Sequence, residues 1–284
     1  MALFDNCVLA SDIDGTLIDS GYISPRNLKA INFFRENGGK FVISTGRSAT
    51  ALGQVFALLD KSLVDPSVVL NGGMIYDFSK NKALYAKILE NETKELARYV
   101  KENFNDVGIE VHSNAEVFSA NATEESEFHE DYELLEREYV TIDDIQDIDW
   151  NKVLYTCKSE EKREELLIRL ADISKGKCIF EKTEINFQGI HHLYLEQLPL
   201  DTTKGNALKI LREILGIKKG GLFVIGDYYN DLEMLKEGDV SATPSGAPDD
   251  LKKIANFVGG SCRDGAVADF IEYLTNWRQK NGPA

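Results

Sequence analysis

The chain has 284 residues, 43% hydrophobic and 28% charged, and a formal net charge of −15. This length exceeds that of most single domains, so we expect two domains, or one domain with a large insertion. The acidic charge argues against nucleic acid and anionic membranes as partners, because both favour basic protein surfaces. The N-terminus lacks the pattern of a secretory signal and no apolar stretch is long enough to span a bilayer, which predicts a cytoplasmic protein.

Four short apolar runs, spread along the chain, each stop at a polar residue. They are CVLASD, KFVISTGR, SVVLNGG and GLFVIGD, and they end at Asp12, Thr45, Asn71 and Asp227. Their continuous apolarity is typical of strands that are covered on both faces, as in a parallel sheet. Because the carboxyl ends of parallel strands lie along one edge, where ligands of open α/β folds bind, we expect these four polar residues to converge.

Helical patterns separate or follow these strands. They are PRNLKAINFFRENGG from residue 25, ATALGQVFALLD from residue 49 and KGNALKILREILG from residue 204, and glycines close the first and the last. Strands that alternate with helices predict an α/β fold, in which a doubly wound and mostly parallel sheet forms the middle of three layers.

The pattern changes between about residue 84 and residue 190. Helical runs such as NETKELARYVKENF alternate there with the strand candidates VLYTCK, CIFEKT and HHLYLEQL. We therefore predict a core of residues 1–84 and 190–284, with an inserted α+β domain at 85–189. Two acidic stretches within it, 122–138 and 141–150, lack the glycine and the terminal Glu of a calcium loop, so we interpret them as a solvated face.

Cysteines and histidines give no sign of a metal site. Cys7, Cys157, Cys178 and Cys262 are scattered without C-x-x-C spacing, which favours buried free thiols over disulfides. The four histidines, which show no ligand spacing either, are expected in the core or on the surface: His112, His129, His191 and His192.

The stretch DIDGT places two carboxylates, Asp12 and Asp14, directly after a buried strand and before a glycine. A carboxylate in such a position can attack phosphorus and form an aspartyl-phosphate. A second carboxylate can protonate the leaving oxygen and later accept a proton from water. Gly15 allows a tight turn and leaves its amide open to phosphate oxygens, although an Asx turn without catalytic function has the same sequence.

Polar groups at other strand or helix ends strengthen this interpretation. GDYYNDLEML offers carboxylates that suit magnesium, while Thr45 and Arg47 of STGR could contact phosphate. Lys204 lies in the first turn of a predicted helix, where the dipole disfavours a cation by up to about 1 kcal/mol, so a nearby anion is indicated. Each feature alone is also explained by a helix cap or a surface side chain, and only the ordered set of four is specific.

In these motifs the chain resembles the haloacid dehalogenase superfamily of phosphohydrolases, in particular the Cof-like branch with a large α/β cap. DIDGTL, STGR, TTKGNAL and GDYYNDLEML resemble its four motifs in order. The resemblance implies that Asp12 is the nucleophile and Asp14 the general acid and base. It further implies that Thr45 and Lys204 stabilise the phosphate and the nucleophile. Because the inserted segment leaves and rejoins the core near the carboxyl edge of the sheet, we expect it to lie over the aspartates and to select the substrate.

By the same resemblance, Mg²⁺ is the cofactor. Its site would comprise Asp12, the backbone carbonyl of Asp14, and Asp227, with Asn230 and Asp231 close by. The residues expected at the metal site are Asp12, Asp14, Asp227 and Asp231. Those expected at the substrate site are Gly15, Arg47, Asn71, Gly72 and Asn230.

The expected activity is hydrolysis of small phosphate monoesters, such as sugar phosphates or cofactor phosphates, by a monomer or small homo-oligomer. Two alternatives remain open. A phosphomutase would use the same aspartate pair, but it usually has a more basic cap. A non-catalytic sugar-phosphate sensor would keep a phosphorylatable Asp and would not need an acid and base at Asp14.

Overall fold

The computed structural model describes residues 2–281. Contacts divide the chain into two units. The first comprises the residues up to Arg47, Gln54–Tyr85 and the residues from Thr203 onward. The second comprises Ser48–Gly53 and Ala86–Thr202, so the inserted segment forms a unit of its own together with a short piece that follows Arg47.

The first unit is built on a five-stranded sheet in which every pair of neighbours is parallel. In spatial order its strands are β16 (Phe257–Val258), β15 (Val240–Thr243), β14 (Leu222–Ile225), β1 (Val8–Ser11) and β4 (Lys40–Ile43). All residues of β1 and β14 are buried, as their continuous apolarity predicts.

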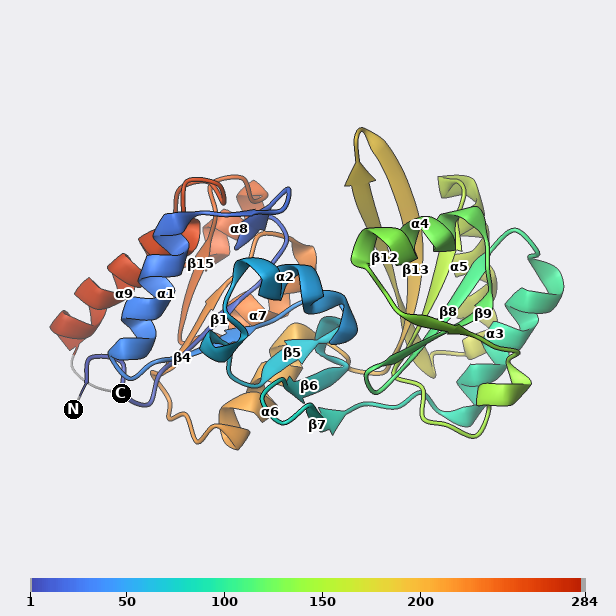
Figure 1. Cartoon of the computed structure of the whole chain (residues 1–284), viewed down its shortest axis with the longest axis horizontal. Coiled ribbons are helices and arrows are strands. Elements are labelled where there is room, and N and C mark those ends of the chain that lie inside the picture. Colours follow the sequence, from blue (N-terminus) through green and yellow to red (C-terminus); the bar gives the residue numbers. More distant parts are fainter. Residues whose placement is uncertain (1, 282–284) are drawn as a thin grey trace. The chain divides into compact units, whose positions relative to one another are not determined.

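Helices cover both faces of this sheet (Figure 1). On one face, α6, α7 and α8 contribute Leu208, Met234 and Leu251 to a core with Val8 and Val224. On the other, Phe223 of β14 meets Trp277, whose ring centroid lies 6.0 Å away. The predicted three-layer α/β core is therefore confirmed. The helices of this unit are α1 (Pro25–Glu36), α2 (Gly53–Leu58), α6 (Lys204–Ile214), α7 (Leu232–Glu237), α8 (Asp249–Ile254) and α9 (Ala266–Asn281).

Two small sheets complete the first unit. A hairpin, β2 (Ile18–Asp19) and β3 (Tyr22–Ile23), follows the first motif. The other sheet orders β5 (Ser67–Val69), β6 (Met74–Asp77) and β7 (Lys82–Ala86). The strand predicted at SVV thus belongs to this second sheet, because the NGG turn after it reverses the chain into antiparallel β6. A single parallel bridge between Ser44 and Val68 links β5 to the end of β4.

The second unit contains a six-stranded sheet with the order β10, β9, β8, β11, β13, β12. Helices α3 and α5 bury their apolar sides against one face of it, where Val111, Val153 and Leu195 form the core. Helix α4 contacts β8 and β11. The elements are β8 (Gly108–Ser113), β9 (Glu116–Asn121), β10 (Arg137–Tyr139), β11 (Lys152–Cys157), β12 (Cys178–Phe187), β13 (Ile190–Pro199), α3 (Asn91–Asn103), α4 (Glu124–Glu133) and α5 (Glu160–Ser174).

Two details of the inserted segment differ from the sequence prediction. Strand β13 pairs with β11 and β12 along its length, so the contacts place the second boundary after Thr202 and not near residue 190. The acidic stretch at 122–138 is not simply a solvated face. Its helix α4 buries His129 and Glu133, because the buried Glu110 of β8 provides a hydrogen-bond partner for the His129 ring.

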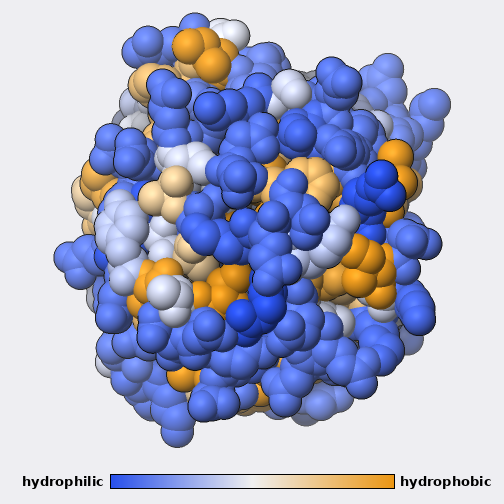
Figure 2. Space-filling model, turned by 90° about the vertical axis from the view of Figure 1, so that its right-hand side faces the viewer, coloured by the Kyte–Doolittle hydropathy of each residue, from blue (hydrophilic) through white to orange (hydrophobic). Residues whose placement is uncertain are grey.

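The four cysteines are free and buried, as predicted. Among the described residues, no helix is both long and apolar enough to cross a membrane. On the face drawn in Figure 2, hydrophilic side chains predominate and hydrophobic ones form separate small patches.

Candidate active site

The carboxyl ends of the central strands carry the acidic residues of the first and fourth motifs. The Asp12 amide donates to the carbonyl oxygen of Ile225 in β14 at 2.9 Å, so the first motif follows β1 directly at this edge. On the other side of β1, the Ser44 amide donates to Ser11 at 2.9 Å. Parallel pairing therefore brings the residues that follow β1, β4 and β14 to one edge of the sheet.

Lys204 joins the first motif to the fourth. It is the first residue of α6, whose N-cap Thr203 accepts a hydrogen bond from the Asn206 amide. Its buried ammonium donates to Oδ1 of Asp12 and to Oδ1 of Asp231, both at 2.6 Å. The nearby anion that the sequence indicated for Lys204 is thus a pair of carboxylates of the protein itself.

Asp231 uses both of its carboxylate oxygens within the protein. Oδ1 accepts from Lys204, and Oδ2 accepts from the backbone amides of Asp227 and Tyr228, at 2.9 and 3.2 Å. The backbone of Gly226 lies so close that a Cβ there would stand 2.4 Å from the Asp231 carboxyl carbon. Asp231 therefore holds both Lys204 and the loop that carries Asp227.

Asp227 is held by a residue to which the sequence interpretation gave no role. The Thr16 hydroxyl donates to Asp227 Oδ1 at 2.7 Å. Gly15, with a φ of +83°, lets the backbone approach, because a Cβ at this position would stand 2.4 Å from Asp227 Oδ2. The D-x-D-G-T motif could have indicated this role for Thr16. Thr16 directly follows the glycine of the turn, where its hydroxyl can reach Asp227 at the end of the neighbouring strand.

Electrostatics at this edge favour a bound cation. Burial raises the pKa of Asp12 well above its usual value, against the opposing effect of Lys204, and Asp231 and Asp227 raise it further. Burial likewise raises the pKa of Asp227 to about 6. Burial alone would lower the pKa of Lys204, but the carboxylates of Asp12 and Asp231 outweigh it and raise that pKa.

One ammonium thus faces three carboxylates, whose oxygens lie within 4.8 Å of one another. The excess negative charge and the purely oxygen donor set fit a hard divalent cation such as Mg²⁺. Thr16 engages Oδ1 of Asp227 and Lys204 engages Oδ1 of Asp12. Each of these two aspartates therefore keeps a second oxygen that neither Thr16 nor Lys204 engages, whereas both oxygens of Asp231 accept hydrogen bonds from Lys204 and the loop amides.

Asp14 lies in a more open position than Asp12. Its side chain is 56% exposed, and Arg47 holds it through two hydrogen bonds of 2.9 Å, from Nε and from Nη2. Thr45 is buried and its Oγ1 accepts from the Arg47 amide at 3.2 Å. The second motif therefore positions the predicted acid and base as well as carrying a hydroxyl beside the end of β4.

The NGG turn contacts the start of α6. Gly72 has a φ of +102°, and a Cβ there would stand 2.2 Å from the carbonyl oxygen of Thr203. Asn71 adopts a left-handed conformation with a φ of 52°, and its Oδ1 accepts from Asn230 at 3.4 Å. This turn supports the segment that presents Lys204.

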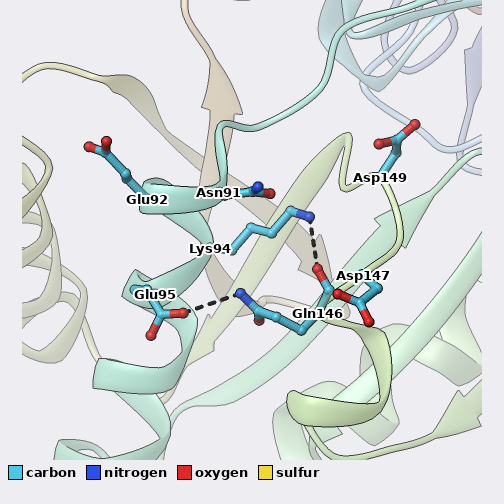
Figure 3. A pocket seen from close by; sticks show the side chains of 7 residues that line it. All are labelled: Asn91, Glu92, Lys94, Glu95, Gln146, Asp147 and Asp149. Carbon is cyan, nitrogen blue, oxygen red and sulfur yellow. Dashed lines mark hydrogen bonds between the residues drawn. The ribbon is translucent and has the colours of Figure 1, made fainter.

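A separate pocket of about 530 Å³ in the second unit is lined mostly by acidic side chains (Figure 3). The ammonium of Lys94 donates to the carbonyl oxygens of Gln146 and Ile148, at 3.1 and 2.7 Å, and lies 5.6 Å from the centre of the Trp150 ring. Lys94 therefore ties a turn to α3, which is a structural role.

Comparisons with known proteins identify the family of this chain. The family model of haloacid dehalogenase-like hydrolases matches residues 9–271. The chain is 28% identical to the 5-amino-6-(5-phospho-D-ribitylamino)uracil phosphatase YwtE of Bacillus subtilis, over 94% of this chain and 97% of that protein. The phosphatase YcsE of the same organism, which is named for the same activity, is 25% identical over 94% of each chain.

Among solved structures, a haloacid dehalogenase-like hydrolase from Bacteroides thetaiotaomicron aligns with a TM-score of 0.80 at 23% identity, over 94% of this chain and 99% of that one. The fold is therefore shared across nearly the whole length. The resemblance drawn from the four motifs is confirmed, and the chain belongs to the haloacid dehalogenase-like hydrolase family, as a phosphatase of that superfamily.

Proposed function

We propose that this phosphatase hydrolyses small phosphate monoesters, with Mg²⁺, through a phosphorylated aspartate. The observation that carries the proposal is the buried Asp12 carboxylate at the end of β1, held at 2.6 Å by the ammonium of Lys204. The ammonium offsets the repulsion between an anionic nucleophile and an anionic phosphate. In-line positioning and charge neutralisation are the main requirements of phosphoryl transfer.

The proposed reaction has two steps. In the first, an Asp12 carboxylate oxygen bonds to phosphorus as the ester P–O bond breaks, and Asp14 gives its proton to the departing alcohol oxygen. In the second, water attacks the aspartyl-phosphate while Asp14 accepts a proton from it. Inorganic phosphate leaves and the Asp12 carboxylate is restored. Arg47 orients Asp14 for both transfers through its two hydrogen bonds.

The acidic residues at this edge divide into two tasks. Asp12, the backbone carbonyl of Asp14, and Asp227 would hold Mg²⁺, which when bound neutralises phosphate charge and orients the phosphoryl group. Asp231 keeps Lys204 and the Asp227 loop in place, since its two oxygens are already engaged. This assignment moves Asp231 from the predicted metal ligands to the positioning residues.

The substrate class is a small molecule with one phosphate ester. YwtE and YcsE are named for their action on 5-amino-6-(5-phospho-D-ribitylamino)uracil, which makes this compound one to test alongside sugar and cofactor phosphates. The testing experiment is phosphate release from such a panel and from p-nitrophenyl phosphate, each with Mg²⁺ and with EDTA. We expect turnover that EDTA removes and added Mg²⁺ restores. A folded protein that releases no phosphate from any of these esters would contradict the proposal.

A further inference from the structure

Ser44 and Asp12 lie side by side where two strands of the first unit end. The last residues of β4 and β1, Ile43 and Ser11, stand opposite each other, so the residues that follow them are neighbours as well. The Ser44 amide continues the pairing, because it donates to the Ser11 carbonyl oxygen at 2.9 Å. Neighbouring strands lie about 4.8 Å apart, so Ser44 is an immediate neighbour of Asp12 within the sheet.

Both side chains point to the face of the sheet that α6 covers. The residues two places earlier, Val42 and Ala10, belong to the core on that face. Because side chains alternate along a strand, residues two places apart share a face. The hydrogen bond from Lys204 of α6 to Asp12 agrees with this orientation. The Ser44 hydroxyl therefore lies on the side from which Lys204 approaches.

The side chain of Lys204 extends past Ser44. Its backbone nitrogen would lie 3.0 Å from a Cβ at Gly72, in the turn that follows β5. Its ammonium lies at Asp12, which follows β1. The end of β4 stands between these two points, since Ser44 pairs with β1 on one side and bridges to Val68 of β5 on the other. The lysine side chain thus crosses the end of β4 on the face to which Ser44 points.

The Ser44 hydroxyl is buried and unpaired. The residue is 0% exposed, and its Oγ has no hydrogen-bond partner among the described residues. A buried polar group without a partner destabilises the folded state, so native proteins rarely keep one without a use for it. An alanine would fill nearly the same space without the unpaired oxygen. The stability of the unreacted protein therefore does not account for a hydroxyl at this position.

The negative charge of Asp12 moves during the proposed reaction. When one carboxylate oxygen bonds to phosphorus, the other becomes a neutral acyl carbonyl oxygen, and the negative charge lies on the phosphoryl oxygens. Lys204 then faces a weaker acceptor, because hydrogen bonds to ionised groups are roughly twice as strong as those to neutral ones. Its ammonium has three N–H donors, of which Asp12 and Asp231 engage two. A neighbouring hydroxyl can offer a further acceptor by rotation alone.

We propose that Ser44 is a positioning residue for the phosphorylated state, in which its hydroxyl accepts a hydrogen bond from Lys204 while Asp12 carries the phosphoryl group. This inference rests on the proposed function. In the unreacted protein the two carboxylates hold the ammonium, and the hydroxyl is not needed. Because Ser44 has no exposed surface, it stabilises the intermediate without contacting the substrate.

Beryllium fluoride provides the test, since it bonds to an aspartate carboxylate as the phosphoryl group does. Inorganic phosphate, in contrast, binds while Asp12 keeps its charge. Both inhibit hydrolysis of p-nitrophenyl phosphate by the full chain with Mg²⁺. In Ser44→Ala we expect the inhibition constant of beryllium fluoride to rise about three- to tenfold, as the loss of one hydrogen bond implies. The inhibition constant of inorganic phosphate should stay within twofold of the parent value.

Two control variants remove a hydroxyl of the same kind elsewhere. Ser119 and Thr243 are also buried, and their hydroxyls are also unpaired among the residues that the structure describes. Ser119 belongs to the second unit, and Thr243 ends β15, which β14 separates from β1. Ser119→Ala and Thr243→Val should leave both inhibition constants within twofold of the parent values.

Thermal unfolding without inhibitors supplies the second measurement. Because the Ser44 hydroxyl is unpaired before the reaction, Ser44→Ala should keep or raise the melting temperature. A rise of less than threefold in the inhibition constant of beryllium fluoride overturns the inference. An equal rise for inorganic phosphate, or the same effect in Thr243→Val, overturns it as well. A folded parent that releases no phosphate from p-nitrophenyl phosphate or any other ester contradicts the proposed function itself, which keeps the two failures distinct.

Discussion

The ammonium of Lys204 lies 2.6 Å from a carboxylate oxygen of Asp12 and 2.6 Å from a carboxylate oxygen of Asp231. Lys204 and Asp231 have no exposed side-chain surface. A buried ion pair of this kind is strongly destabilised when one partner is lost, because the other charge stays behind without compensation. The triad therefore couples the geometry of Asp12, the proposed nucleophile, to the stability of the first unit.

Asp231→Asn tests this coupling. The amide keeps one acceptor oxygen but loses the charge that fixes Lys204, so we expect kcat to fall about 10- to 100-fold. The activating concentration of Mg²⁺ should change little, in contrast to Asp227→Asn, which should raise it strongly. Titration of the activity of each variant with Mg²⁺ measures both its kcat and its activating concentration of Mg²⁺. Glu233→Gln, on the exposed side of α7, is the matched control. A larger loss of Mg²⁺ affinity in Asp231→Asn than in Asp227→Asn would identify Asp231 as the ligand.

Asp12→Asn should abolish turnover while the protein remains folded. An amide is a poor nucleophile and a weaker ligand for Mg²⁺, and the substitution also removes one partner of Lys204. Phosphate release and circular dichroism check the two parts of this prediction. Turnover within tenfold of the parent by a folded variant would reject Asp12 as the nucleophile.

Asp14→Asn should separate the two steps of the reaction. The leaving group of an aryl phosphate needs little protonation, so the first step should survive, while hydrolysis of the aspartyl-phosphate slows. Rapid mixing with p-nitrophenyl phosphate should therefore give a burst of phenolate followed by slow release of phosphate. Equal slowing of phenolate and phosphate release, without a burst, is the outcome that excludes the double role of Asp14.

The sequence predicted the core and the order of its motifs because a buried parallel strand has a distinctive apolar run and ends at a fixed edge. The helices that begin at residues 25 and 204 were also predicted correctly, because the residues that cap them lie next to the helix starts in the sequence. Ser24 accepts from the Arg26 amide, and Pro25 follows at the first helical position.

Other features depend on contacts between residues far apart in sequence and have no local pattern. The bond from Thr16 to Asp227 spans 211 positions, and that from Lys204 to Asp12 spans 192. The acidic α4 looked solvated because nothing near it in sequence shows that Glu110, 19 residues before His129, would accept a hydrogen bond from the His129 ring. The boundary after Thr202 was missed since β13 pairs backward, into the inserted sheet.

The buried His129 should make stability depend on pH. Burial lowers its pKa, but the carboxylates of Glu110 and Glu133 outweigh burial and raise that pKa above 6.5. The folded state thus binds the proton more tightly than the unfolded state does. This contribution to stability is complete below about pH 6.5 and is lost as the pH rises through the folded pKa, by at most about 1.4 kcal/mol per pH unit.

His129→Gln removes the titration and keeps a hydrogen-bonding side chain. The difference in free energy of unfolding between parent and variant, from urea titrations at several pH values, should shrink between pH 6.5 and pH 9. A parent that gains stability over His129→Gln as the pH rises would show that His129 is neutral when folded.

Gly72→Ala tests whether the NGG turn supports Lys204, for which we propose a role in catalysis. Alanine at a φ of +102° is strained, and its Cβ would stand 2.2 Å from the carbonyl oxygen of Thr203, a backbone atom that has no alternative rotamer. We expect the free energy of unfolding to fall by about 2–4 kcal/mol from these two effects together. Because Thr203 caps α6, the displaced backbone should also move Lys204 and lower kcat in the fraction that stays folded.

Gly246→Ala is the matched control for that experiment, since nothing lies within 4 Å of a Cβ at Gly246. Its effect on the free energy of unfolding should stay within about 0.5 kcal/mol, and its kcat should equal that of the parent. Urea unfolding measures the free energy of unfolding of both variants, and initial rates of phosphate release at the same temperature measure their kcat. If Gly72→Ala is as stable and as active as Gly246→Ala, the turn does not determine the position of Lys204, and the close approach at Thr203 has no catalytic consequence.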